Sequence, residues 1–196
     1  DARRARELAA SSIAPLRLQV EQLDRRQTTA ESIRAAIPFQ TQAVDIDTAA
    51  RAVRIVPARE TQLGLAGLME AEQQIAARFA DWSIRILPPV QPLPDVAFAS
   101  GAELDEAALA TVNVIVWVMK AWEADACTVK GRVPLGGSAA ANRRLALERA
   151  EAVAALLKAA GIEAAAESGY GESGQAAEER RFGQIHFQSA VVTPAL

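Results

Sequence analysis

The sequence contains very few of the residues that build disulfides, metal centres and common catalytic sites. It has one cysteine, Cys127, and one histidine, His186, in 196 residues. A single cysteine excludes an internal disulfide framework and a cysteine-rich metal site. A single histidine excludes a multi-histidine metal site and argues against a histidine-based catalytic triad. Nucleophile-elbow and phosphate-loop motifs are also missing, so we expect no enzymatic activity, no metal and no cofactor.

Long apolar runs and one-sided charge are missing as well. No run approaches the roughly 20 apolar residues that a membrane helix needs, and no signal peptide is visible. The net charge is -3, and the basic residues are scattered among acidic ones, which gives no indication of a nucleic-acid partner. The chain starts with Asp1 rather than methionine, so we expect a membrane anchor or targeting segment to precede it.

The composition that remains is that of an ordinary globular protein. Hydrophobic residues make up 51% and charged residues 23% of the chain, the usual balance for a folded domain. Aromatic residues are only 5%, so the core is expected to consist mainly of aliphatic side chains. The segment 88–94 contains four prolines and favours an extended polyproline conformation. We therefore predict a linker at residues 89–94, between two small domains.

Residues 1–27 are predicted to form an amphipathic helix. Apolar residues repeat there at spacings of three and four, which places them on one stripe. Two interpretations stay open: a helix that packs on its own domain, or a short coiled-coil stalk that leads out of a membrane anchor. The stripe consists of Ile13, Leu16, Val20 and Leu23.

Residues 28–88 are predicted to form a small α+β domain in the order helix, strand, strand, helix, strand. Thr28 and Glu31 have capping-box spacing, which predicts a new helix at this point. Alternation of apolar and polar residues predicts the three strands. This α-β-β-α-β order resembles the BON-like modules of envelope proteins, a resemblance that implies contacts with membranes or sibling domains. The strand-forming pairs are Val44 and Ile46, Val53 and Ile55, and Ile84 and Ile86.

Residues 95–190 are predicted to form a second domain, in the order strand, helix, strand, helix, strand, strand. The helices are expected at 104–122 and at about 139–160, with a strand through Cys127 and Val129 between them. The last strand is predicted through Ile185 and Phe187, where His186 would point outward. Cys127 would point inward and be an inert core residue. Residues 191–196 are left as a C-terminal tail.

The second domain carries a motif, which reads G-R-V-P-L-G-G-S-A-A-A-N-R-R-L-A-L-E-R-A-E-A-V over residues 131–153. It resembles the signature of the OmpA-like, peptidoglycan-associating domain without a gap. This resemblance implies an OmpA-like β-α-β-α-β-β sandwich for residues 95–190, and the whole chain is predicted to be a two-domain α+β protein. The matching positions are Gly131, Gly137, Ser138, Asn142, Leu145, Arg149, Ala150 and Val153, with Phe98, Gly101, Leu104 and residues 169–172 as flanking matches.

The resemblance also implies a ligand. In the family, an aspartate and an arginine hold the diaminopimelate residue of the peptidoglycan stem peptide, and the arginine falls on Arg149. A guanidinium binds a carboxylate through two parallel hydrogen bonds. Gly131, Arg132 and Asn142 would complete the candidate peptidoglycan-binding site. The alternative for Arg149 is a structural ion pair with Glu148, Glu151 or Glu172, and Asn142 is expected to support the loop through its backbone.

The sequence departs from the family where the ligand would be held. Arg132, Val133 and Pro134 stand at the positions of the family's histidine, threonine and aspartate. Loss of one charge-assisted contact costs about 1.5 to 3 kcal/mol, which is roughly ten- to a hundredfold in affinity. The family's C-terminal N-R-R-V motif is replaced as well, and Arg180 and Arg181 nearby could add charge to the pocket or be solvated.

Two functions follow as hypotheses. The first is a structural or assembly module with a degenerate OmpA-like domain in a periplasmic or envelope-spanning complex, whose partners are other envelope proteins. The alternative is a cell-wall anchor that recognises diaminopimelate through Arg149. Both hypotheses place the chain on the periplasmic side of the bacterial envelope, attached to a membrane.

Overall fold

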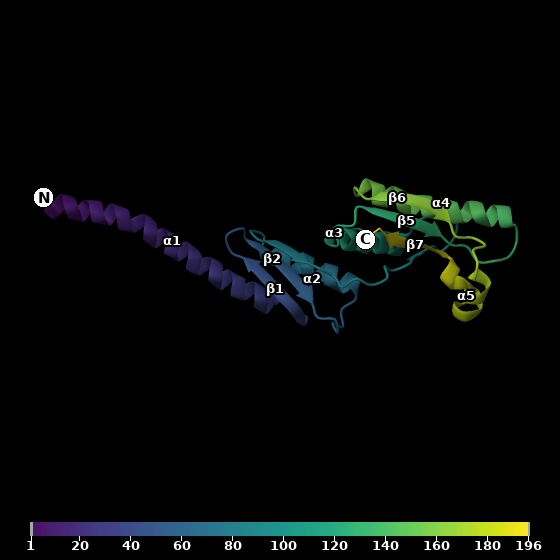
Figure 1. The fold of residues 1–196 in the computed structure, drawn as a ribbon, viewed down its shortest axis with the longest axis horizontal. Coiled ribbons are helices and arrows are strands. Elements are labelled where there is room, and N and C mark those ends of the chain that lie inside the picture. Colours follow the sequence, from purple (N-terminus) through teal and green to yellow (C-terminus); the bar gives the residue numbers. More distant parts are fainter. Residues whose placement is uncertain (1, 196) are drawn as a thin grey trace. The chain divides into compact units, whose positions relative to one another are not determined.

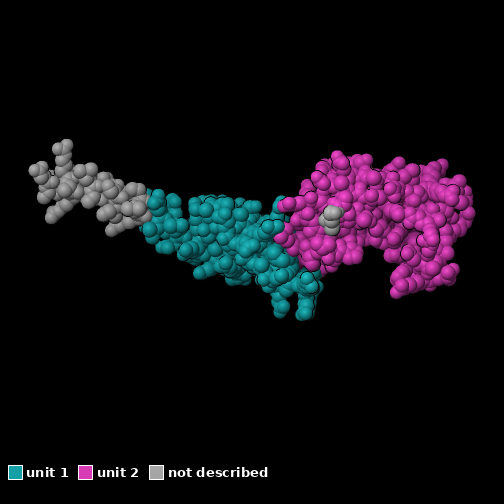
Figure 2. Space-filling model, in the orientation of Figure 1, with its two compact units in different colours: residues 1–63, 70–86 teal, residues 64–69, 87–196 magenta. Residues whose placement is uncertain are grey.

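The computed structural model describes the backbone of residues 2–195 and the side chains of residues 18–195. The chain divides into two compact units. The first consists of residues 1–63 and 70–86 and the second of residues 64–69 and 87–196, teal and magenta in Figure 2. Both combine helices with small sheets (Figure 1), so the predicted α+β class is confirmed. In the described part of the chain, no helix has the length and apolarity to cross a membrane.

The first helix, α1, runs without interruption over Ala2–Ala36, so the new start predicted at Thr28 is wrong. The hydroxyls of Thr28 and Thr29 donate to the carbonyl oxygens of Asp24 and Arg25, at 2.9 and 2.8 Å. A threonine that bonds four residues back stays inside a helix instead of capping a new one. Thr28 and Glu31 therefore have the spacing of a capping box, but Thr28 does not start a helix.

The apolar stripe predicted on this helix is only partly covered by the described residues. The side chains of Ile13 and Leu16 lie outside them. Val20 and Leu23 are 56% and 53% exposed, whereas Ala30 and Ile33, further along α1, are buried. The C-terminal part of α1 therefore packs within the first unit.

The first unit continues with β1 (Thr41–Asp47), β2 (Ala52–Pro57), α2 (Leu65–Arg78, whose residues 70–78 belong here) and β3 (Ser83–Ile86). The predicted order α-β-β-α-β is thus confirmed. The strands form a sheet in the order β1-β2-β3, antiparallel between β1 and β2 and parallel between β2 and β3. Its buried side chains come from both helices and two strands: Ala30, Ile33, Val53, Ile55, Ala71, Ile75 and Ile86.

The second unit contains β4 (Val96–Ala97), α3 (Glu106–Ala121), β5 (Ala126–Gly131), α4 (Ala139–Ala159), β6 (Glu163–Ser168), α5 (Gln175–Phe182), the 3-10 helix η1 (Gln184–Phe187) and β7 (Ser189–Pro194). The predicted β-α-β-α-β-β order holds, with α5 and η1 inserted before the last strand. The sheet order is β4-β7-β5-β6; β7 is antiparallel to both neighbours and β6 is parallel to β5.

The last strand differs from its prediction. Ile185 and Phe187 lie in η1, and the strand begins only at Ser189. Residues 191–194, which we predicted as part of a tail, belong to β7 in the middle of the sheet. The alternation of Ile185 and Phe187 around His186 imitates a strand, but Gly183 at φ +83° turns the chain into a helical turn there.

Helices α3 and α4 cover one face of this sheet. Their buried residues join those of the strands in one core, to which β5 contributes Cys127 and Val129, and β7 contributes Val192. Both helices start at a side-chain cap, because Asp105 and Ser138 accept hydrogen bonds from Ala108 and Ala141. The opposite face of the sheet carries the alternate, more exposed residues of each strand.

The proline-rich segment packs on the second unit. The unit begins at residue 87, and Leu93 is buried in its core. The indole Nε1 of Trp122, at the end of α3, donates to the carbonyl oxygen of Pro88 at 2.9 Å. Segment 88–94 is therefore a fixed part of the second unit in spite of its irregular backbone.

Candidate functional site

Arg149 occupies the centre of the candidate site and is held inside the protein. It lies in the middle of α4, and only 3% of its surface is exposed. Its Nε donates to the carbonyl oxygen of Gly101 at 2.7 Å, and its Nη1 donates to that of Arg132 at 2.8 Å. The guanidinium also lies over the ring of Phe98, 5.2 Å from its centroid. One side chain thus ties α4 to the segment after β4 and to the loop after β5.

The charge of Arg149 is compensated by carbonyl dipoles and an aromatic ring. Of the three glutamates considered as partners, Glu148 pairs with Arg144 at 3.3 Å and Glu172 pairs with Lys130 at 2.7 Å. In the described part of the chain no ion pair joins Arg149 to Glu148, Glu151 or Glu172. Burial lowers the pKa of Arg149 because it removes water from the charged form.

The motif loop at residues 132–136 is fastened through its backbone. The carbonyl oxygen of Arg132 binds Arg149, as described above, and its amide donates to the carbonyl oxygen of Ser189 at 2.7 Å. The side-chain amide of Asn142 donates to the carbonyl oxygen of Gly136. The predicted supporting role of Asn142 is therefore confirmed.

Two residues of α5 hold the same loop, and sequence reasoning missed both. Gln175, which is buried, donates from Nε2 to the carbonyl oxygen of Val133 and to Glu179 Oε1, each at 2.8 Å. Glu179 Oε1 in turn accepts a bond from the amide of Leu135 at 2.6 Å. The i, i+4 spacing of a glutamine and a glutamate was the available signal, but nothing in it predicts where the pair points.

Gly131 is required by the approach of α4 to β5. A Cβ atom at this position would lie 1.7 Å from the carbonyl oxygen of Ala146 and 3.1 Å from the amide nitrogen of Ala150. Such distances are impossible without a shift of the helix backbone. The glycine that opens the motif therefore permits the close packing of helix and strand.

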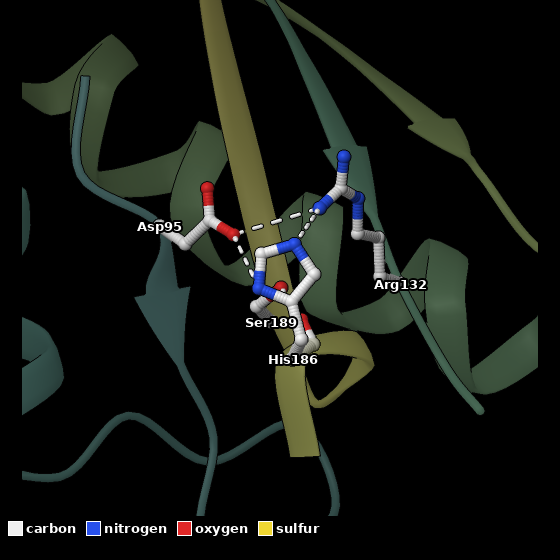
Figure 3. Close-up of polar contacts among 4 residues, drawn as sticks. All are labelled: Asp95, Arg132, His186 and Ser189. Carbon is white, nitrogen blue, oxygen red and sulfur yellow. Dashed lines mark hydrogen bonds and ion pairs between the residues drawn. The ribbon is translucent and has the colours of Figure 1, made fainter. Parts of the chain in front are cut away.

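A second cluster of charged side chains lies around Arg132. Figure 3 shows Arg132 and His186 turned toward the carboxylate of Asp95. Arg132 Nη1 lies 3.5 Å from Asp95 Oδ2, and His186 Nδ1 lies 3.9 Å from the same oxygen. Arg132 Nη1 is also 3.2 Å from His186 Nε2. Nε2 can accept from the guanidinium when the ring proton is on Nδ1, whereas the buried Asp95 Oδ2 has no hydrogen-bond partner among the described residues.

The cluster does not have the geometry of a nucleophilic triad, although serine, histidine and aspartate are all near. The Ser189 hydroxyl donates to the main-chain oxygen of His186 at 2.9 Å. The ring nitrogen that would accept a serine proton is instead occupied by Arg132 (Figure 3). The cluster connects His186 of η1 to Asp95, next to β4, and to Arg132, next to β5. The Arg132 guanidinium is therefore engaged within the domain.

The other singled-out residues lie apart from this site. Cys127 is buried on the inward side of β5, as predicted, and burial raises the pKa of its thiol. Arg180 and Arg181 are exposed on α5. Within the described residues, no group of three or more histidine, cysteine, aspartate or glutamate side chains could hold a metal ion.

The chain is similar in structure to a known domain, although its sequence matches no family model. No family model matches the chain, and no curated protein matches it. Among solved structures, the chain is similar to the OmpA-like domain of FopA1 from Francisella tularensis subsp. tularensis SCHU S4. The sequence identity is 20% and the TM-score 0.39, over 52% of this chain and 74% of that one. This match gives no support to the BON-like resemblance of residues 28–88.

Proposed function

We propose that the chain is a non-enzymatic assembly module of the bacterial cell envelope, facing the periplasm, in which a degenerate OmpA-like domain makes protein contacts. The envelope location follows from the sequence motif at residues 131–153. The non-enzymatic character is supported by the engagement of His186 with Arg132 and Asp95 and by the single, buried cysteine. Attachment to a membrane is part of the proposal.

The observation that carries the proposal is the engagement of Arg149. Its Nε and Nη1 bind two backbone carbonyl oxygens within the domain, and its side chain is buried. A ligand carboxylate that took these donors would leave two carbonyl groups unpaired, at a cost of about 1 to 3 kcal/mol for each one that stays buried. Arg149 therefore acts as a structural residue that joins α4 to two loops.

The other motif residues also have structural roles. Gly131 permits the close approach of α4, and Asn142 holds the loop at Gly136. Arg132, at the family's histidine position, pairs with Asp95. Pro134, at the aspartate position, offers no carboxylate to a ligand ammonium. Each retained residue thus supports the fold, and the residue that would complete a ligand clamp is replaced.

The alternative function is a cell-wall anchor that binds diaminopimelate through Arg149. The retention of the arginine with Asn142 and the two glycines of the motif favours it. For this function, the guanidinium would have to present a donor to the ligand beyond the two that the backbone carbonyl groups occupy.

Cosedimentation with insoluble peptidoglycan decides between the two functions. We expect the wild-type chain to stay in the supernatant. A variant that restores the family motif, Arg132→His with Val133→Thr and Pro134→Asp, serves as a probe of whether this fold can carry the complete clamp. Saturable sedimentation of the wild type that Arg149→Lys abolishes, with the variant still folded by circular dichroism, would establish the anchor and refute our proposal.

A further inference from the structure

β6 lies at the edge of its sheet, where a segment of another chain can add a strand. β6 is the last strand of the order β4-β7-β5-β6 and, among the described residues, it pairs with β5 alone. The amides of Glu163 and Gly169 donate toward the β5 side, to Asp125 and Gly131, at 2.7 and 2.8 Å. In a parallel ladder the residues that bond to one neighbour alternate along the strand. The N–H and C=O groups of Ala164, Ala166 and Ser168 therefore face away from β5.

The side chains along β6 leave room for an incoming strand. Three consecutive alanines, residues 164–166, form its centre. Sheets usually protect their edges with bulky charges, proline or bulges. Here the two charged residues, Glu163 and Glu167, lie with Ala165 on the exposed face of the strand. The residues whose backbone groups face away from β5 are Ala164, Ala166 and Ser168, and their side chains are small and uncharged.

An apolar hollow adjoins the start of this edge. It has a volume of about 670 Å³, and most of its lining residues are small or apolar. They are Ala126, Cys127, Gly161, Ile162, Ala164 and Ala165, together with Lys158 and Glu163. In strand addition, main-chain hydrogen bonds supply affinity, and pockets that receive alternate side chains supply selectivity. The hollow provides such a pocket for an apolar side chain.

The charges of Glu163 and Glu167 determine which kind of chain can pair with β6. Two β6 edges paired antiparallel about Ala165 would set Glu163 opposite Glu167 of the second copy, and like charges in cross-strand positions are destabilising. A second copy of this chain in that register is therefore disfavoured. Lys130 lies beside Glu167 in the register but is paired with Glu172 at 2.7 Å. The exposed face of the edge thus offers carboxylates to an incoming strand.

We propose that β6 is a docking edge for an extended segment of a partner protein in which basic and apolar residues alternate. Its basic side chains meet Glu163 and Glu167, and an apolar side chain enters the hollow beside Ile162 and Ala164. This inference rests on the proposed assembly role and names the kind of segment that such a role would capture.

The test uses a capped hexapeptide, Lys-Val-Lys-Val-Lys-Val, titrated into the whole chain with amide hydrogen exchange read by NMR. We expect saturable binding and at least a roughly tenfold slowing of exchange at Ala164 and Ala166, the gain of a ladder hydrogen bond. The same peptide with N-methylated backbone amides on alternate residues should give no protection. Binding without protection of these amides, or no binding at millimolar peptide, refutes the proposal.

Charge selection has its own controls. Glu163→Gln combined with Glu167→Gln should weaken the peptide about two- to tenfold, as expected for two exposed ion pairs. Glu148→Gln combined with Glu151→Gln, two exposed carboxylates on α4, should leave the affinity unchanged. Equal binding of a Glu-Val hexapeptide, or amides at 164 and 166 already protected by self-association of the free chain, would overturn the assignment. The peptidoglycan assay can fail or succeed independently of these results.

Discussion

The α-carbon of Gly131 faces the backbone of Ala146 so closely that a Cβ atom would lie 1.7 Å from the carbonyl oxygen of that residue. The strand and the helix that carry the family-like motif thus meet at a point where no side chain fits. Gly131 and Arg149 both support the packing of α4 on β5. Gly131 has no side chain that would push the helix away, and Arg149 donates a hydrogen bond to the carbonyl oxygen of Arg132, the first residue after β5.

Gly131→Ala is expected to destabilise the second unit by about 1 to 3 kcal/mol or more, because α4 must move away from β5. Chemical unfolding of the whole chain in urea measures the change. Ala165→Ser adds one heavy atom at an exposed position of the neighbouring strand and should change the free energy of unfolding by less than about 0.5 kcal/mol. Equal stability of the two variants would contradict the contact.

Arg149→Met is expected to cost about 2 to 4 kcal/mol, since it leaves the carbonyl oxygens of Gly101 and Arg132 without donors while it keeps most of the apolar stem. Thermal unfolding followed by circular dichroism reports the loss. Arg143→Met, at an exposed position of the same helix, is the matched control and should be nearly neutral. A neutral Arg149→Met would indicate that the arginine is kept for a ligand.

Gln175→Ala should loosen the motif loop more than it affects the whole unit. It removes bonds to Val133, Gly171 and Glu179, a loss of about 1 to 3 kcal/mol where buried groups stay unpaired. We expect faster amide exchange at Leu135 and a smaller increase in exchange rate at the amides of the core strands. Glu178→Ala, exposed on the same helix, should leave the exchange at Leu135 as it was; uniform acceleration throughout the unit would argue for global destabilisation instead.

Cys127 should react with a thiol reagent only when the chain opens. Burial raises the pKa of its thiol, so the folded chain keeps the proton at pH values where the unfolded chain releases it. The unfolded state then binds fewer protons, and stability falls as pH rises above about 8.5. Absorbance after addition of dithionitrobenzoate, with and without urea, measures the access, and Cys127→Ala should flatten the alkaline loss of stability. Rapid labelling of the folded chain would contradict this burial.

The sequence predicted the order of elements in both units because the apolar periodicity of each element follows from the face that it buries. Helix α4 lies close to the predicted range 139–160, and strand β5 lies where Gly131 and the alternation around Cys127 placed it. Local patterns failed where tertiary contacts decide. Thr28 has a capping-box partner but bonds to Asp24 within a continuous helix, and the alternation at Ile185 and Phe187 belongs to η1.

The candidate site was predicted only in part for the same reason. Asn142 could be assigned to its loop, since a motif places it three residues into α4. The donors of Arg149 end on carbonyl groups up to 48 residues away, and no side-chain pattern marks a backbone acceptor. Gln175, Glu179 and Asp95 act through equally distant partners, which only the folded chain brings together.

The position of β7 has a consequence for how the second unit is made. Residues 189–194 separate β4 from β5, so these two strands have no pairing with each other until that segment is present. During synthesis, β5, β6 and α4 can already associate, whereas β4 must wait for a strand made nearly a hundred residues later. The sheet can therefore be completed only after β7 has been synthesised. Until then the edges of β4 and β5 that pair with β7 stay exposed, and unpaired strand edges of this kind are prone to aggregation.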